Sequence, residues 1–167
     1  VLGRAIDPEH EANITVLVNH IENGNYLDAE PGILIGKPLA ERLGITVNNY
    51  ATVSVWDKYS ARNFDEVKVV GIFNFAYPAM DENLIFMDIN TADLILDMDH
   101  EITRFVIRLE NSENIRPVIT SLNNTFTENN LELKAYTWER FAEVVVSAVK
   151  MDGTSFFIIM IICFILI

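Results

Sequence analysis

The chain ends in fourteen residues without a charge, TSFFIIMIICFILI at 154–167. A helix needs about 20 apolar residues to cross the hydrocarbon core of a bilayer, so this run has the length of an incomplete span. Two interpretations stay open: the first part of a transmembrane helix, or an apolar core helix. The chain also begins at Val1 in an apolar stretch, without the basic and apolar regions of a signal peptide. We expect a piece of a longer membrane protein.

The charge of the chain limits its partners. Twelve Lys and Arg residues stand against 24 Asp and Glu residues, giving a formal net charge of −12. Phosphate groups are bound by basic surfaces, so this balance argues against a nucleic-acid partner. It also disfavours adhesion to an anionic lipid surface. The single cysteine, Cys163, excludes a disulfide within the chain and a cysteine-based metal site.

The first hundred residues predict short strands and helices in mixed order. Strands are expected at 1–6, 32–36, 51–57, 66–73 and 84–88, with the third and fourth forming a hairpin connected by Lys58–Asp65. Helices are expected from Asp7-Pro8 through Ile21 with a stop at Gly24, at 38–43 with a stop at Gly44, and at 90–97 from Asn90 or Thr91. Within 66–73, alternation places Val67, Val69, Gly71 and Phe73 on one face.

The last third reads as strand, helix, strand. Residues 102–109 and 131–137 alternate in hydropathy, and 114–126 carry an apolar face at helical spacing made of Ile115, Val118, Ile119, Leu122 and Phe126. This order is half of a split βαβ, or ferredoxin-like, unit. Thr137 then caps a final helix that can continue into the apolar run. We expect an α+β fold.

No pattern in the sequence indicates catalysis. The three histidines lie in separate segments without metal-ligand spacing, and no nucleophile elbow or phosphate-binding loop is present. The acidic stretch 93–101 lacks the glycine and the spacing of a calcium loop. We therefore expect no catalytic residue, no cofactor and no metal ligand, and interpret the chain as a non-enzyme.

Two apolar features are candidate contact surfaces for a partner or a lipid. The first is FNFAYPAM at 73–80, with Phe75, Tyr77, Pro78 and Met80. The alternative for this loop is that Tyr77 and Met80 fold back on the core. The second feature is the aromatic set around the hairpin tip, Trp56, Tyr59 and Phe64. Cross-strand aromatic pairing is the alternative explanation for this second set.

The order of four motifs resembles a known family. GILIGKPLAERLGI at 32–45 is followed by VKVVGIF at 67–73, MDENLIFMDINTADLIL at 80–96, and AYTWERF at 135–141 before an apolar helix. This order resembles the extracytoplasmic domain of FtsX/MacB-like ABC transporter permeases. GRAIDPEHE at 3–11 and NGNYL at 23–27 are most similar to the lipoprotein-releasing branch, LolC/LolE.

The resemblance implies the fold and the function that we expect. It implies a protein of the bacterial inner membrane with a MacB-like periplasmic core domain, in which residues 1–152 are extracytoplasmic. It implies a mostly β-rich part at 1–100, the half unit of the split βαβ part at 101–137, and a stalk helix that enters the membrane at 138–167. In this stalk Trp138 and Phe141 would couple the domain to the membrane. It implies a cytoplasmic ABC ATPase and a second permease subunit, homo- or heterodimeric, as partners, and lipoprotein cargo. Export of a drug, peptide or toxin, an FtsX-like adaptor of a cell-wall hydrolase, and a soluble binding module remain alternatives.

Two positions depart from the family pattern. Asn48-Asn49 stands where the family usually has Gly-Asp, and Asn tolerates the left-handed turn that this position needs. The connection Lys58–Asp65 is too short for the chaperone-gripping hook of the LolC-type subunit. A LolE-like or generic permease therefore fits better than a subunit that recruits a chaperone.

Overall fold

The computed structural model describes residues 1–27, 30–56, 59–111 and 114–140. The chain divides into two compact units, Val1–Ile107 and Arg108–Ile167, which are considered separately. Both contain helices, and the first contains a mixed sheet, so the expected α+β class is confirmed. The β-rich part expected at 1–100 and the half unit expected at 101–137 stay predictions, and the boundary between the two compact units lies between residues 107 and 108.

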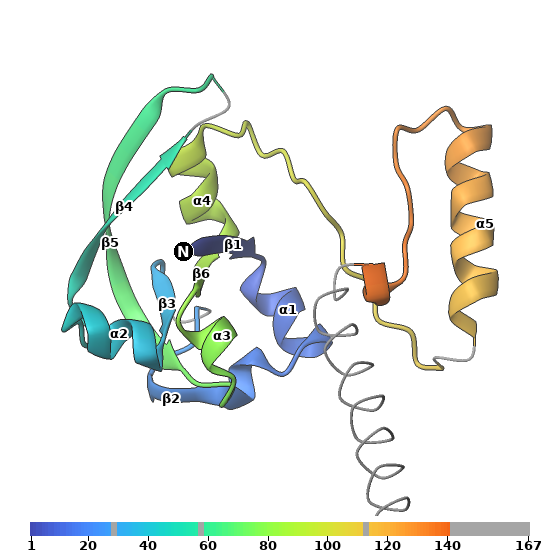
Figure 1. Ribbon diagram of the computed structural model, residues 1–167. Helices are drawn as coiled ribbons and strands as arrows, with labels where there is room; N and C mark the ends of the chain where they lie inside the picture. The colour runs from blue at the N-terminus through green and yellow to red at the C-terminus, as the bar shows by residue number, and fades with distance from the viewer. Residues whose placement is uncertain (28–29, 57–58, 112–113, 141–167) are drawn as a thin grey trace, which may run out of the picture. The chain divides into compact units, whose positions relative to one another are not determined.

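The first unit is built on a six-stranded sheet (Figure 1). Its strands are β1 Leu2–Ile6, β2 Ile21–Gly24, β3 Ile33–Gly36, β4 Tyr50–Trp56, β5 Arg62–Phe73 and β6 Leu84–Asp88. The order is β1-β6-β3-β5-β2, and β4 pairs with β5 beside β2. β1 with β6 and β3 with β5 are parallel, while the other pairs are antiparallel. The strands expected at 1–6, 32–36, 51–57 and 84–88 are confirmed.

Two apolar clusters lie on the two faces of this sheet. Successive residues of β3 belong to opposite clusters: Ile33 and Ile35 are in the first cluster and Leu34 is in the second. Helices α2 Lys37–Leu43 and α4 Ile89–Leu96 pack on the first cluster. The segment of α1 Pro8–Ile14 and the 3₁₀ turn η1 Leu17–His20 pack on the second. A short helix, α3 Pro78–Asp81, precedes β6.

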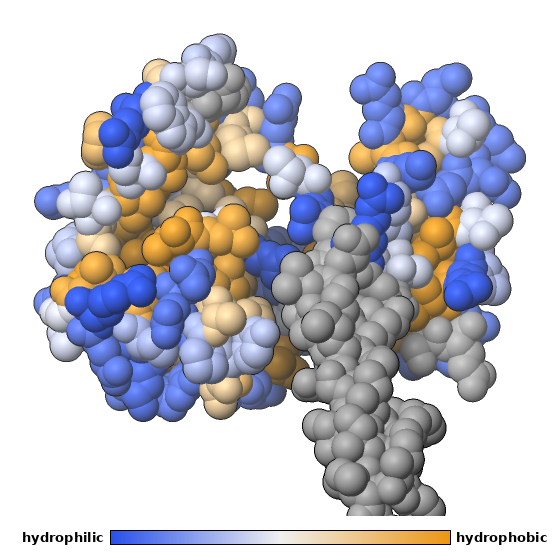
Figure 2. Space-filling model, in the orientation of Figure 1, coloured by the Kyte–Doolittle hydropathy of each residue, from blue (hydrophilic) through white to orange (hydrophobic). Residues whose placement is uncertain are grey.

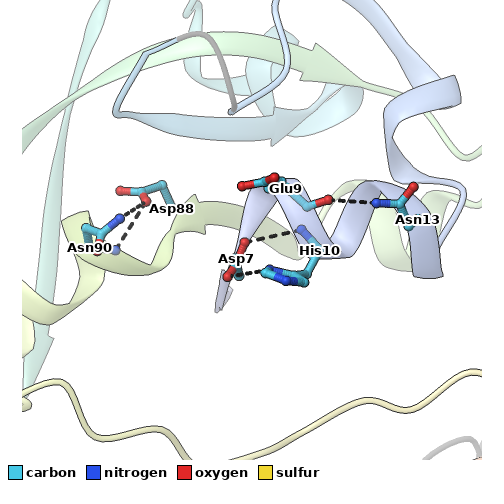
Figure 3. Close-up of polar contacts among 6 residues, drawn as sticks. All are labelled: Asp7, Glu9, His10, Asn13, Asp88 and Asn90. Carbon is cyan, nitrogen blue, oxygen red and sulfur yellow. Dashed lines mark hydrogen bonds and ion pairs between the residues drawn. The ribbon is translucent and has the colours of Figure 1, made fainter.

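Aspartates cap the helices that follow the two neighbouring parallel strands β1 and β6 (Figure 3). Asp7 accepts from the His10 backbone N–H at 3.2 Å, as the predicted cap requires. Its hydrogen bonds with His10 hold the pKa of Asp7 below the ordinary value. The predicted start of α4 at Asn90 or Thr91 is wrong, because Asp88 is the cap and accepts from the backbone N–H groups of both.

The Asp88 carboxylate is nearly buried and receives four hydrogen bonds from Asn90 and Thr91, at 2.7–3.2 Å. Burial is the largest single influence and would raise the pKa of Asp88. The hydrogen bonds together outweigh it and hold that pKa below its ordinary value. The ionised carboxylate therefore stabilises the start of α4.

The helix predicted from Asp7 through Ile21 is wrong beyond Ile14. Thr15 is extended, and residues 21–24 form β2, which pairs with β5. The helical spacing of the apolar residues is outweighed by pairing with a distant strand. Gly24 does not end a helix: its φ is +81°, and a Cβ there would lie 2.3 Å from the Val70 carbonyl oxygen. Glycine is needed because two backbones approach closely.

Strand β5 ends at Phe73 as expected but differs from expectation in its start and in its register with β3. It begins at Arg62, so the hairpin connection is shorter than the predicted Lys58–Asp65. A bulge shifts the register against β3, where Ile33 pairs with Val69 and Leu34 with Gly71. This extra residue reverses the alternation, so Val67 and Val69 join one cluster and Phe73 the other. The prediction of a single face for these residues is therefore wrong.

The second unit contains α5 Ile115–Glu128, as the apolar spacing predicts. All five residues of the predicted apolar face are partly buried, and Pro117 lies in the first turn. The flanking segments 102–109 and 131–137 are not strands, and both of these predictions are wrong for the described residues. Their alternating pattern suits a strand, but a strand forms only where another strand accepts its backbone hydrogen bonds.

Candidate contact surfaces

The connection between β5 and β6 is the first candidate surface, and we call residues 73–81 the 73–81 loop. Its start is fixed to the sheet edge, because the Asn74 N–H donates to the His20 carbonyl at 2.9 Å. Asn74 Nδ2 also donates to Glu22 Oε1 at 2.7 Å, and Glu22 pairs with Lys37 at 2.8 Å. The hydrogen bond with Lys37 lowers the pKa of Glu22 and raises that of Lys37.

Phe75 turns inward from the 73–81 loop. Its ring lies 5.1 Å from that of His20, 5.0 Å from Phe73 and 6.4 Å from Phe86. These distances are typical of aromatic packing, and the side chain contacts the second apolar cluster. Among the predicted contact residues of this loop, Phe75 therefore belongs to the core edge.

Tyr77, Pro78 and Met80 turn outward instead. Tyr77 is 46% exposed and Met80 is 40% exposed, so neither folds back fully on the core. Both belong to one turn, since the Met80 N–H donates to the Tyr77 carbonyl at 2.9 Å. Together with Pro78 at the start of α3 they form a small apolar surface. Apolar side chains grouped in this way suit contact with a partner.

Asp81 positions this turn, although nothing in the sequence singles it out. It is 1% exposed, and its carboxylate accepts from the Phe75 N–H at 3.1 Å and the Tyr77 N–H at 3.0 Å. Gly36 makes room for it, because a Cβ there would lie 1.9 Å from the Asp81 carbonyl oxygen. Ala76 is left-handed, with φ +58°. The hydrogen bonds to Asp81 therefore fix the conformation of the 73–81 loop, including its left-handed residue.

The β4–β5 hairpin carries the second candidate surface. Trp56, Tyr59 and Phe64 are 67%, 70% and 62% exposed. Trp56 lies opposite Arg62, and Phe64 lies opposite Ser54, so these two aromatic residues are not directly paired. The Arg62 guanidinium covers the Phe64 ring at 4.9 Å and donates from Nε to Ser54 Oγ at 2.8 Å. Direct cross-strand aromatic pairing thus does not account for the set.

Of the two predicted stalk residues, the structure describes only the first. Trp138 is 60% exposed and begins the 3₁₀ turn η3 Trp138–Arg140, while Phe141 lies outside the described residues. The Arg140 N–H donates to the Thr137 carbonyl at 3.3 Å. Arg140 also covers the Tyr136 ring, 4.0 Å from its centroid. Nothing in the sequence singles out this pair, since a basic residue four positions after a tyrosine is common.

The Asn123 side chain of α5 holds the backbone of segment 131–137. The Ala135 N–H donates to Asn123 Oδ1 at 2.8 Å, and Asn123 Nδ2 donates to the Ala135 carbonyl at 3.2 Å. Asn123 thus contacts Ala135 as a neighbouring strand would. Leu131 and Leu133 nearby are about half exposed, and apolar residues lie open on this unit (Figure 2).

Neither metal sites nor membrane spans are found in the part of the chain that the structure describes. Within residues 1–27, 30–56, 59–111 and 114–140, no group of three or more His, Cys, Asp and Glu side chains could hold a metal ion. Among the same residues, none of the helices has the length and apolar character needed to cross a bilayer. The apolar run 154–167 lies outside them.

Comparison with known proteins gives no family assignment: no protein-family model matches the chain, and neither does any curated protein.

Proposed function

We propose that the chain is the extracytoplasmic part of an ABC transporter permease subunit that transmits ATP-driven motion, in a system for lipoprotein release from the bacterial inner membrane. The observation that carries the proposal is the ordered set of motifs in the sequence, from GILIGKPLAERLGI at 32–45 to AYTWERF at 135–141. In this proposal the ATPase is a separate cytoplasmic protein, and residues 1–152 lie outside the cytoplasm.

The finer fold belongs to the same proposal. A MacB-like domain would join segments 102–109 and 131–137 to further strands in a split βαβ part. Three features support this idea: the alternation of both segments, the confirmed apolar face of α5, and the Asn123 contact that holds Ala135 extended. The segments then need partner strands that the described residues do not supply.

The stalk is proposed to begin at Trp138. This exposed residue directly follows segment 131–137, and the apolar run 154–167 begins sixteen residues later. A helix continuous from this point into the membrane would carry movement between the two. Trp138→Ala should therefore abolish transport while the ATPase subunit still co-purifies. Leu94→Ala, an equally conspicuous exposed apolar residue of α4, is the matched control and should transport normally.

Membrane topology tests the proposal as a whole. Single cysteines are introduced at the exposed positions Ser60 and Leu94 in a Cys163→Ser background, in the full-length protein in cells. A membrane-impermeant maleimide should label both from outside the inner membrane. Labelling only from the cytoplasmic side, or recovery of the protein in the soluble fraction, would contradict a permease and leave a binding module as the explanation.

A further inference from the structure

Strand β4 presents an unusual free edge. Its sequence YATVSVW contains no charged residue, no proline and no glycine, and its register with β5 continues over Tyr50–Trp56 without a bulge. In the described part of the chain β4 pairs with β5 alone. Proteins generally protect an edge strand with charges, proline or a bulge, because the free edge accepts another strand. In a chain of net charge −12, an uncharged edge of this length is suited to a strand partner.

The backbone groups on this edge can be assigned from the turn before β4. The Asn48 N–H donates to the Val69 carbonyl and the Val69 N–H donates to the Asn49 carbonyl, both at 2.8 Å. Antiparallel alternation from this point directs the groups of Ala51, Val53 and Val55 toward β5. The N–H and C=O groups of the other four residues, Tyr50, Thr52, Ser54 and Trp56, therefore point outward.

The strand is also symmetric in residue type about Val53. Aromatic Tyr50 and Trp56 lie three positions away on either side, aliphatic Ala51 and Val55 two, and the hydroxyl residues Thr52 and Ser54 one. An antiparallel copy centred on Val53 would place like beside like at each position. All the outward residues then meet outward residues, since 52 opposes 54 and 50 opposes 56.

We propose that β4 is a dimerisation strand, which pairs with β4 of a second copy of this chain across a two-fold axis at Val53. Tyr50 then lies against the partner subunit's Trp56, and Thr52 against the partner subunit's Ser54. Aromatic and hydroxyl pairs of this kind stabilise antiparallel strands. The interface is isologous, so the same edge serves both subunits and no further edge is left on β4.

The neighbouring strand supports the pairing. Within one subunit, Arg62 lies beside Trp56 and Lys68 beside Tyr50. A row across the joined sheet would run Arg62, Trp56, the partner's Tyr50 and the partner's Lys68, with a cation at each end of an aromatic pair. Cations next to aromatic rings are favourable. Because β4 has no charge, the two acidic subunits bring no like charges directly opposite each other.

Disulfide cross-linking tests the register of the pairing. The full chain in detergent micelles carries Cys163→Ser and one new cysteine. Val53→Cys lies on the axis, where paired Cα atoms are about 4.5 Å apart, a distance that a disulfide spans. Val55→Cys is the matched control on the same partly buried face, and its two copies would be about 13 Å apart along the strands. Val53→Cys should cross-link at least about tenfold faster; equal rates would overturn the proposal.

Charge substitution tests whether association depends on this edge. The double variant Thr52→Lys with Ser54→Lys opposes lysines at two places and should weaken the dimer about tenfold or more. Thr52→Lys with Ser54→Glu opposes unlike charges and should keep the dimer. Mass is measured by sedimentation equilibrium, with circular dichroism to check that both variants fold. Unchanged association in the lysine variant, loss in both, or a monomeric unsubstituted chain would each refute the second copy as occupant.

Discussion

The buried carboxylate of Asp81 should account for much of the stability of the 73–81 loop. It accepts two backbone hydrogen bonds, from Phe75 and Tyr77, in a side chain that is 1% exposed. A hydrogen bond to a charged group contributes about 1.5–3 kcal/mol, and an abandoned buried donor costs about 1–3 kcal/mol. Because the loop is partly exposed, water can replace some of the hydrogen-bond energy that the substitution removes. We expect Asp81→Ala to lower the free energy of unfolding by about 3 kcal/mol.

Urea denaturation followed by circular dichroism measures this change. The midpoint should fall with an unchanged m-value, since the substitution leaves the compactness of the fold intact. Glu82→Ala is the matched control: it removes the same charge from the next residue and should stay within about 0.5 kcal/mol of the unsubstituted chain. A loss below about 1 kcal/mol for Asp81→Ala would refute the argument, because both amides would then have found other acceptors.

Three further predictions concern single side chains. Asp88→Ala should cost about 2 kcal/mol at pH 7. Because the folded pKa of Asp88 lies below the unfolded value of about 3.9, this difference should be complete above pH 4 and shrink as the pH of the denaturation falls below it. Gly36→Ala should destabilise by about 3 kcal/mol or more in thermal unfolding, since its Cβ meets backbone, whereas Gly3→Ala meets only ordinary contacts and should be nearly neutral. Ala76→Gly should raise stability by about 0.5–1 kcal/mol by relieving a left-handed alanine, and an unchanged melting temperature would contradict this.

The elements that sequence predicts well are those decided by neighbouring residues. Helix α2 is set by Pro38 near its start and Gly44 at its end, where φ is +65°. The apolar face of α5 follows from spacing alone. Strand β3 is an apolar run between glycines and is buried throughout. In each case the signal lies within a few residues of the element that it specifies.

The elements that sequence predicts poorly depend on distant backbone. The segment before Gly24 has helical spacing, and only its pairing with β5 makes it a strand. The bulge in β5 is a property of its register with β3, so alternation along β5 gives no sign of it. Segments 102–109 and 131–137 show the reverse case, in which a correct strand pattern has no strand to pair with among the described residues.

Which candidate contact residues face the core and which face outward also depends on contacts that the local sequence does not specify. Composition identifies the apolar loop at 73–80, but it does not distinguish the inward Phe75 from the outward Tyr77. That division is made by Asp81, whose acidic side chain would be assigned to the surface from sequence. The register excludes a directly opposed aromatic pair for Trp56 and Phe64, because each of them lies opposite a non-aromatic residue.

Strand β4 and segment 131–137 differ in how their backbone groups can be satisfied. One edge of β4 is paired with β5, and the strand has no charged residue and is symmetric in residue type about Val53. The β4 strand of a second copy can therefore satisfy the backbone groups on its other edge. Segment 131–137 is instead bonded to its own helix α5, where Asn123 bonds both backbone groups of Ala135 and the Phe126 carbonyl accepts from the Leu131 N–H. In the proposed split βαβ part this segment would pair with strands outside the described residues. Dimerisation through β4 and completion of the second unit are therefore separate events, and Thr52→Lys with Ser54→Lys should weaken the first about tenfold or more without affecting the second.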